Sequence, residues 1–248
     1  MTGPDVTGRG TARPPATGPD HTAPGAPGGH GLSGVADAGA FLARLVRLDR
    51  AALVRLRPDA ASGRTVLWAR LPWGVLVART VAGTGPGDVT VAAGDLLAEL
   101  AAESRALPAR RDARWRWPLP PAASRQVETL PATEVRRVAE AAAQALRDAS
   151  AHGVAGRAVG QRMLRDALLD HVPVVVTPDD APGTPVEVPQ RLVQGLVRMG
   201  FLGADESAER VQVRAVGRWV GLVGPYGSAW SQTATDLAVR PTASHPFG

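Results

Sequence analysis

The chain has 248 residues, of which 44% are hydrophobic and 4% aromatic, and its formal net charge is +5. This length is sufficient for two small domains, and the composition predicts cores built mainly from Leu, Val and Ala. All 28 basic residues are Arg and Cys is absent, which excludes lysine Schiff-base chemistry, thiol nucleophiles, disulfides and thiolate metal sites.

The two ends of the sequence differ in composition from its middle. Residues 1–33 consist largely of Thr, Gly, Pro and Ala. Such a segment buries too little apolar surface to offset the entropy of ordering, so we expect a disordered tail in which His21 and His30 are solvated. Residues 231–248 lose apolar periodicity and are predicted to form a second tail. We find no secretory signal and no apolar run of about 18 residues, and therefore expect a cytoplasmic protein without membrane association.

Residues 36–104 are predicted to form an N-terminal α+β domain with a small antiparallel sheet. A helix begins near Asp37, because apolar residues recur at helical spacing as far as Leu48. Short apolar runs separated by turn residues predict strands at 53–57, 65–71, 74–81 and 88–91, followed by a helix over 94–104. The Gly-rich run before the fourth strand is interpreted as a turn and not a phosphate loop, because a strand follows it.

Residues 105–130 are interpreted as an interdomain linker rich in Arg, Trp and Pro. Within it the segment RWRW places Arg114, Trp115, Arg116 and Trp117 in alternation. Aromatic rings interleaved with guanidinium groups are typical of surfaces that bind single-stranded nucleic acid. In the alternative that we favour, prolines stiffen the linker, the tryptophans pack on the domains and the arginines stay in water.

Residues 131–230 are predicted to form a mainly helical domain that ends in a β-hairpin. Helical periodicity predicts helices from Thr133 to Ala151, over 157–170 and over 188–199, and a short strand lies before the third helix. Alternation then predicts strands at 211–216 and 219–223 joined by a two-residue turn. This order of elements resembles a winged-helix domain.

Four sequence blocks resemble an uncharacterised two-domain protein family from actinobacteria, over about residues 36–240. The blocks are FLARLVRLDRAALVRLRPD, LPWGVLVA, WRWPLPP and GRWVGLVGPYGSAW. The resemblance implies a domain boundary near residues 105–130. It implies no activity and no functional residue.

No residue pattern predicts catalysis, a cofactor or a metal ion. His152 and His171 lie in predicted ordered segments without a metal-ligand pattern around them, and Ser228 lacks the frame of a nucleophile elbow. The adjacent Asp179 and Asp180 are interpreted as solvated residues of a loop. We therefore expect a protein that is not an enzyme.

Two hypotheses of function remain from the sequence. The favoured one is a protein-interaction or structural module, with a protein partner or self-association, in which Trp219, Tyr226 and Trp230 anchor an interface. The alternative is nucleic-acid binding by the winged-helix-like unit. Its contacts would come from the third helix and the hairpin, through Gln190, Arg191, Gln194, Arg198, Arg214 and Arg218. The small excess of Arg over acidic residues between Val186 and Val223 weighs against that alternative.

Overall fold

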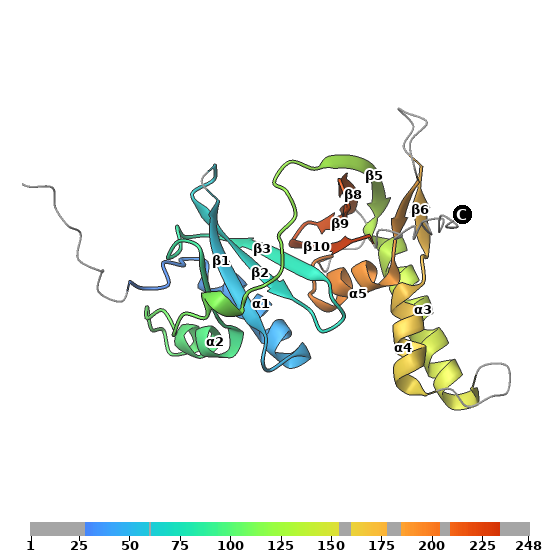
Figure 1. Ribbon diagram of the computed structural model, residues 1–248, viewed down its shortest axis with the longest axis horizontal. Coiled ribbons are helices and arrows are strands. Elements are labelled where there is room, and N and C mark those ends of the chain that lie inside the picture. Colours follow the sequence, from blue (N-terminus) through green and yellow to red (C-terminus); the bar gives the residue numbers. More distant parts are fainter. Residues whose placement is uncertain (1–27, 60, 154–159, 178–184, 204–208, 234–248) are drawn as a thin grey trace, which may run out of the picture.

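A computed structural model describes residues 28–59, 61–153, 160–177, 185–203 and 209–233 (Figure 1). The fold is α+β, as the sequence predicts. In the described part of the chain the helices are α1 (Val35–Leu48), α2 (Ala93–Ala101), α3 (Ala132–His152), α4 (Gln161–Asp170) and α5 (Gln190–Arg198), with a 3₁₀ turn, η1 (Asp112–Arg114).

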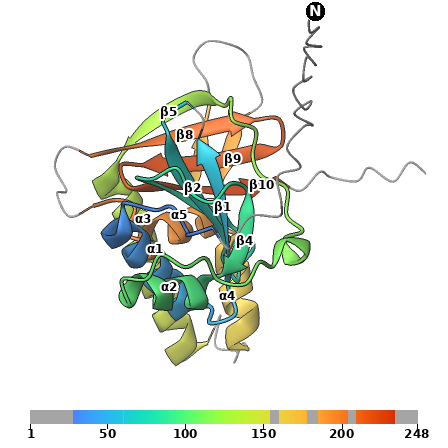
Figure 2. The ribbon, with the colours of Figure 1, turned by 90° about the vertical axis from the view of Figure 1, so that its left-hand side faces the viewer.

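The strands form one eight-stranded sheet that spans both halves of the sequence (Figures 1 and 2). Its order is β4 (Val89–Ala92), β1 (Leu53–Asp59), β2 (Arg64–Arg70), β3 (Leu76–Val81), β10 (Gly227–Gln232), β9 (Trp219–Gly224), β8 (Arg210–Val216) and β5 (Arg125–Pro131). All neighbours are antiparallel. A separate pair consists of β6 (Val174–Val176) and β7 (Val186–Val188).

The two halves of the sequence meet at the centre of this sheet. Leu76 of β3 pairs with Trp230 of β10, and Ala78 pairs with Ser228. Four strands from residues 53–92 therefore continue directly into four strands from residues 125–232.

The helices cover one face of the sheet, which we call the helix face. In α1 the buried residues recur at helical spacing, Asp37 lies in the first turn and Arg47 in the last, and both charges suit the helix dipole. Phe41 of α1 stacks on Phe201, which follows α5, with ring centroids 6.3 Å apart. Helix α5 lies close to the sheet because it carries Gly195, where an added Cβ would lie 3.1 Å from a methyl group of Val75. One aliphatic core thus joins both halves.

The opposite face of the sheet is covered by residues 105–124, which we call the strap, and this face is named the strap face. Leu76, Trp219 and Trp230 form a second buried cluster there. From the strap, Trp115 and Trp117 pack against that cluster, in contact with each other edge to face, 5.3 Å between centroids. The strap therefore closes this face with side chains and without a helix.

The structure gives no support to a winged-helix domain. The predicted hairpin forms as β8 and β9, with Gly217 at φ +53° in the turn. However, β8 also pairs with β5 and β9 also pairs with β10, so the hairpin lies inside the large sheet and is not a free wing. Strand β5 begins within the segment interpreted as a linker and ends one residue beyond it. The small strand pair before α5 was not expected as a pair.

Part of the predicted N-terminal tail is packed. His30 is 3% exposed, its Nδ1 accepts a hydrogen bond from the backbone N–H of Leu32 at 3.1 Å, and its Nε2 lies 3.0 Å from the carbonyl oxygen of Ser104. The expectation that His30 is solvated is therefore wrong. At the other end, β10 continues to Gln232, beyond the expected boundary at residue 230.

Several sequence predictions lie outside the described residues. They concern His21 in residues 1–27, the start of the second predicted helix, the Asp179–Asp180 pair and residues 234–248. None of the helices in the described part of the chain is long and apolar enough to cross a membrane.

Candidate binding cavity

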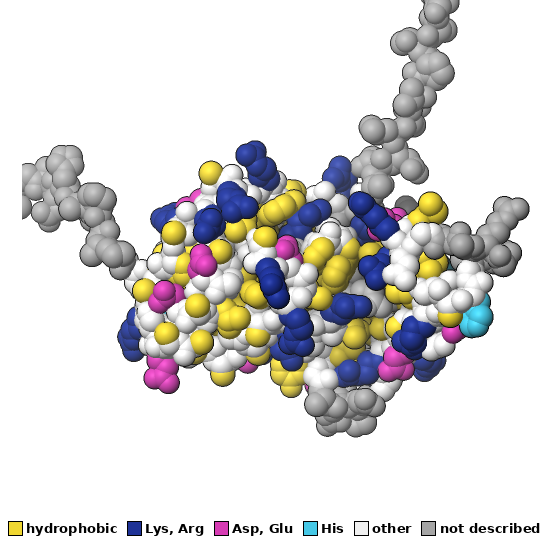
Figure 3. All heavy atoms as spheres, turned by 90° about the horizontal axis from the view of Figure 1, so that it is seen from below, with side chains coloured by type: hydrophobic (Ala, Val, Ile, Leu, Met, Phe, Trp, Pro, Cys, Tyr) yellow, Lys and Arg dark blue, Asp and Glu magenta, His cyan; other side chains and the backbone are white. Residues whose placement is uncertain are grey.

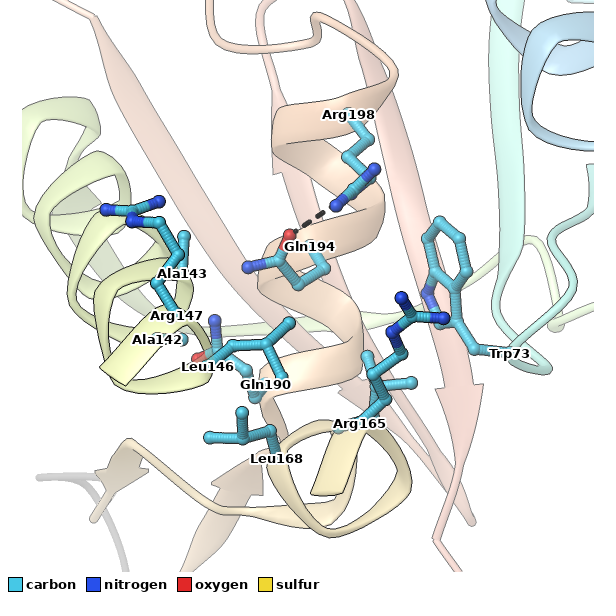
Figure 4. A pocket seen from close by; sticks show the side chains of 11 residues that line it. Trp73, Ala142, Ala143, Leu146, Arg147, Arg165, Leu168, Gln190, Gln194 and Arg198 are labelled. Carbon is cyan, nitrogen blue, oxygen red and sulfur yellow. Dashed lines mark hydrogen bonds between the residues drawn. The ribbon is translucent and has the colours of Figure 1, made fainter. Parts of the chain in front are cut away.

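A cavity of about 560 Å³ lies between α3, α4 and α5 beside the turn that joins β2 and β3 (Figure 4). Helix α4 has no buried residue, and apolar side chains of α3 and α4 line the space between the helices. The side chains that line it are Trp73, Ala142, Ala143, Leu146, Arg147, Arg165, Leu168, Leu169, Gln190, Gln194 and Arg198.

The walls of the cavity are mostly apolar. Leu146 from α3 and Leu168 from α4 face the space, and the small side chains of Ala142 and Ala143 leave room next to them. Trp73 closes one side, and its position is fixed because its Nε1 donates a hydrogen bond to the carbonyl oxygen of Arg191 at 3.1 Å. These walls suit an apolar side chain of a ligand.

Gln190 is a buried polar group without a partner. It is the first residue of α5 and is 2% exposed, and in Figure 4 its amide points toward α3. Neither its side-chain oxygen nor its side-chain nitrogen has a hydrogen-bond partner among the described residues. An unsatisfied buried polar group costs about 1 to 3 kcal/mol, so a ligand that both donates and accepts a hydrogen bond here would remove that cost.

Three exposed arginines surround the cavity, one on each helix: Arg147, Arg165 and Arg198. None of them forms a salt bridge with an acidic residue in the described ranges, and no acidic residue lines the cavity. Arg198 donates a hydrogen bond to the side-chain oxygen of Gln194 at 3.4 Å, and in Figure 4 Arg165 rises from α4 alongside Trp73. The cavity is therefore apolar inside and positive at its rim.

The structure separates the six residues predicted to bind nucleic acid into two groups. Gln190, Gln194 and Arg198 line the cavity, and Arg191 lies beside it in an ion pair with Asp170. The other two residues lie elsewhere.

Arg214 and Arg218 belong to the β8–β9 hairpin. Arg214 alternates with Val213, which is buried on the helix face, so it points to the strap face. There its Nε donates a hydrogen bond to Ser124 Oγ at 2.8 Å. Arg218 lies in the turn and donates a hydrogen bond to Gln232 at 2.9 Å. The six residues thus do not share one surface.

The aromatic residues predicted to anchor an interface are mostly covered by the chain itself. Trp219 is 9% exposed and Trp230 is 7% exposed, because the strap packs over both. Tyr226 is 44% exposed, with the guanidinium carbon of Arg79 5.5 Å from its ring centroid. Only Tyr226 of these three presents a large surface to solvent.

In the RWRW segment the two residue types separate. Trp115 and Trp117 are half-buried against the sheet, and the Nε1 of Trp115 donates a hydrogen bond to the carbonyl oxygen of Trp117 at 2.7 Å. Arg114 and Arg116 are exposed. The tryptophans therefore fasten the strap, and the arginines remain free to contact a ligand.

Sequence reasoning missed the cavity, because its lining comes from four segments that are far apart in the chain. Trp73, Leu146, Arg165 and Gln190 have no common motif. The run of alanines in α3 was the one available signal, since small residues on a helix leave space beside a neighbour. Among the described residues no group of three or more His, Cys, Asp or Glu could hold a metal ion.

Two family models match the chain, and they meet within the strap. Residues 32–117 match a model described as "Domain of unknown function (DUF8010)", and residues 119–236 match one described as "Domain of unknown function (DUF8185)". No curated protein gives a significant sequence match. The chain therefore contains two domains of unknown function.

Solved structures with a similar fold include subunits of bacterial DNA polymerases. The beta subunit from DNA polymerase of Streptococcus pyogenes is 9% identical with a TM-score of 0.49, and the match covers 80% of this chain and 62% of that chain. The DNA polymerase sliding clamp from Pseudomonas aeruginosa is 10% identical with a TM-score of 0.48, over 82% and 64% of the two chains. This chain thus spans less than two thirds of the length of either.

Proposed function

We propose that the protein is a non-enzymatic interaction module that binds a segment of a partner protein in the cavity between α3, α4 and α5. The observation that carries this proposal is Gln190, a buried amide that lines the cavity with both of its polar atoms unpartnered among the described residues. Proteins rarely retain such a group without a role, because it lowers stability.

The main chain of an extended peptide matches this amide. A peptide offers a C=O acceptor and an N–H donor on neighbouring residues, so Gln190 can donate to one and accept from the other. An apolar side chain of the same peptide fits between Leu146 and Leu168. A carboxylate next to it faces Arg165 and Arg198 at the rim. The favoured ligand is therefore an acidic segment with a large apolar residue.

The cavity offers little for the other function classes. Its lining contains no His, Ser, Thr, Tyr or acidic side chain, so it has no nucleophile and no general acid or base for hydrolysis. Nucleic-acid binding by α5 and the hairpin has less support, because the residues in question lie on two faces of the sheet. The five helices also carry nine Arg against eight acidic residues, so the helix face is not strongly basic. Figure 3 shows arginines there interspersed with apolar and acidic side chains.

Selection from a displayed library of random peptides tests the proposal. On the full-length protein, the enriched peptides should combine an acidic residue with Leu or Phe. Gln190→Met keeps the size of the side chain and removes both hydrogen bonds. This variant should bind an enriched peptide about 10-fold less tightly than wild type does. A 10-fold loss is within the range expected when hydrogen bonds of about 1 to 3 kcal/mol are removed. The melting temperature of this variant should stay the same or rise, because a buried amide without a partner is gone.

Arg162→Ala is the matched control. Arg162 lies on α4 like Arg165, but it is 96% exposed and outside the cavity lining. Peptide affinity should be unchanged in Arg162→Ala and reduced in Arg165→Ala. Selection that yields basic peptides, or equal affinities for wild type and Gln190→Met, contradicts the proposal.

A further inference from the structure

On the strap face arginines exceed acidic residues by more than they do on the helix face. Arg55 and Arg57 alternate in β1 with Val54 and Leu56, which are buried on the helix face, so the arginines point the other way. Seven of the arginines that this alternation or the strap places on this side are Arg55, Arg57, Arg70, Arg110, Arg114, Arg116 and Arg214. Acidic residues near them include Asp49, Asp88 and Asp112. We call this set of seven arginines the arginine band.

Several members of the band are held in place before any ligand binds. The guanidinium carbon of Arg70 lies 5.1 Å from the ring centroid of Trp117, and that of Arg55 lies 5.9 Å from Trp115. Arg214 donates hydrogen bonds to Ser124, which is the last residue of the strap. Guanidinium groups fixed on aromatic rings lose less conformational entropy when they bind an anion than mobile side chains would.

The band is too long for a single small anion. Arg55 in β1 and Arg214 in β8 are separated by four strands in the sheet, which corresponds to about 24 Å at about 4.8 Å between neighbours. Phosphates along one strand of a duplex recur about every 3.4 Å. A polyanion with regularly spaced charges can therefore contact many of these arginines at once.

A small cavity lies within the band. It measures about 190 Å³, and Arg70, Arg114 and Trp117 are among the residues that line it, together with Asp49. One water occupies about 30 Å³, so this space can take a group as large as one phosphate, and two arginines in its lining can donate hydrogen bonds to it.

The surroundings of the band argue against a lipid surface and against base stacking. The large hydrophobic residues that are exposed in the described part of the chain are Val35, Met163, Val175 and Tyr226, and none belongs to the strap. Peripheral membrane binding needs apolar side chains that enter the bilayer, and the band offers none. The rings of Trp115 and Trp117 are packed in the second cluster, so they are not free platforms for bases.

We infer that the strap face binds nucleic acid through its phosphates, independently of base sequence. The contacts come from the arginine band, with Arg70 and Arg114 holding one phosphate at the small cavity. This site lies on the opposite side of the sheet from the peptide cavity and uses different residues from those of a winged helix, apart from Arg214.

Fluorescence polarisation with the full-length protein tests the inference. The probe is fluorescein-labelled oligothymidylate of about 20 nucleotides, long enough to cross the face, with a duplex of the same length in parallel. Binding should be measurable at about 50 mM salt and should weaken steeply toward about 200 mM. Arg114→Ala with Arg116→Ala should reduce affinity at low salt and flatten the plot of log K against log salt by up to about 1.4 for the single strand.

The matched control removes two arginines from the helix side. Arg137 and Arg162 are 74% and 96% exposed, on α3 and α4, and like Arg114 and Arg116 they are exposed arginines, but they lie on the other side of the sheet. Arg137→Ala with Arg162→Ala should bind the probe like wild type. Absence of binding at about 50 mM salt, equal loss in the control pair, or equal competition by polyglutamate of the same charge would each overturn the inference. Competition by polyglutamate would assign the face to an acidic protein.

Discussion

The two faces of the large sheet are covered in different ways. On the helix face, α1, α2 and α5 bring aliphatic side chains that are fully buried, such as Leu42, Leu96 and Leu196. On the strap face, a segment that is irregular apart from η1 covers the sheet with tryptophans. Because one indole buries as much surface as several small side chains, a single layer of extended chain closes this face where the other needs three helices.

The distribution of tryptophan follows from this difference. Of the six tryptophans in the chain, five lie in the cluster between the strap and the sheet, two of them contributed by the strap. The sixth, Trp73, lines the cavity on the helix side. The strap keeps its arginines at the surface while its rings face inward. Most of the buried aliphatic side chains therefore lie on the helix face. The strap face has a smaller buried cluster together with exposed arginines.

The largest effect on stability is expected on the helix face. Leu196 is 0% exposed and lies in the main core, so Leu196→Ala leaves a cavity and should lower the free energy of unfolding by about 2 to 5 kcal/mol. Urea unfolding followed by far-ultraviolet circular dichroism measures this change. A loss below about 1 kcal/mol would mean that α5 is packed more loosely than its burial indicates.

A smaller and more local effect is expected on the strap face. Trp115→Ala with Trp117→Ala should lower the free energy of unfolding by about 2 kcal/mol, since both rings are only half-buried. Blue-shifted tryptophan emission should decrease, and limited proteolysis should cut the strap before the helices. Arg114→Ala with Arg116→Ala is the control in the same segment and should change neither measurement. If the tryptophan variant resists protease like wild type, the strap is not held by these rings.

The smallest effect is expected at an ion pair on the strap face and depends on pH. Arg55 donates two hydrogen bonds to Asp88, at 2.6 and 2.8 Å, and holds the pKa of that carboxyl below its ordinary value of about 3.9. A lowered pKa stabilises the folded state above that ordinary value, and the stabilisation is lost as pH falls through the lowered pKa. Asp88→Asn should therefore be less stable than wild type near pH 7, by at most about 1 kcal/mol because the pair is partly exposed.

The pH series of unfolding midpoints checks this sign. The difference between the two proteins should shrink as pH falls below the ordinary value of about 3.9. It should vanish only below the lowered pKa, where Asp88 of the folded wild type is neutral as well. A difference that persists unchanged at acid pH would show that the amide substitution acts through packing and not through charge.

Local features of the fold were predictable from the sequence. The strand at 65–71 corresponds to β2 and the helix that begins at Thr133 corresponds to α3. The hairpin around Gly217 also formed where alternation and turn chemistry placed it. Each of these elements is determined by residues close together in the sequence, and the periodicity of apolar residues reveals such local structure.

The pairing of distant strands was not predictable in the same way. Alternation indicates which face of a strand is buried, but not that Leu76 lies opposite Trp230. The winged-helix interpretation failed for this reason, since the order of elements is compatible with a free hairpin or with a hairpin inside a sheet. Gln190 illustrates the same limit at the site. Its place before the apolar stripe of α5 suggested an outward side chain, and only the packing of α3 and α4 buries it.

The central pair of strands also has a consequence for synthesis on the ribosome. Strand β3 leaves the ribosome about 150 residues before β10, which at about 5 to 20 residues per second is a delay of roughly 7 to 30 seconds. During that interval the backbone groups of Leu76–Ala78 have no β10 to pair with, and an open strand edge can recruit a strand from another chain. A nascent chain that stalls between these strands exposes an edge that the finished protein keeps closed.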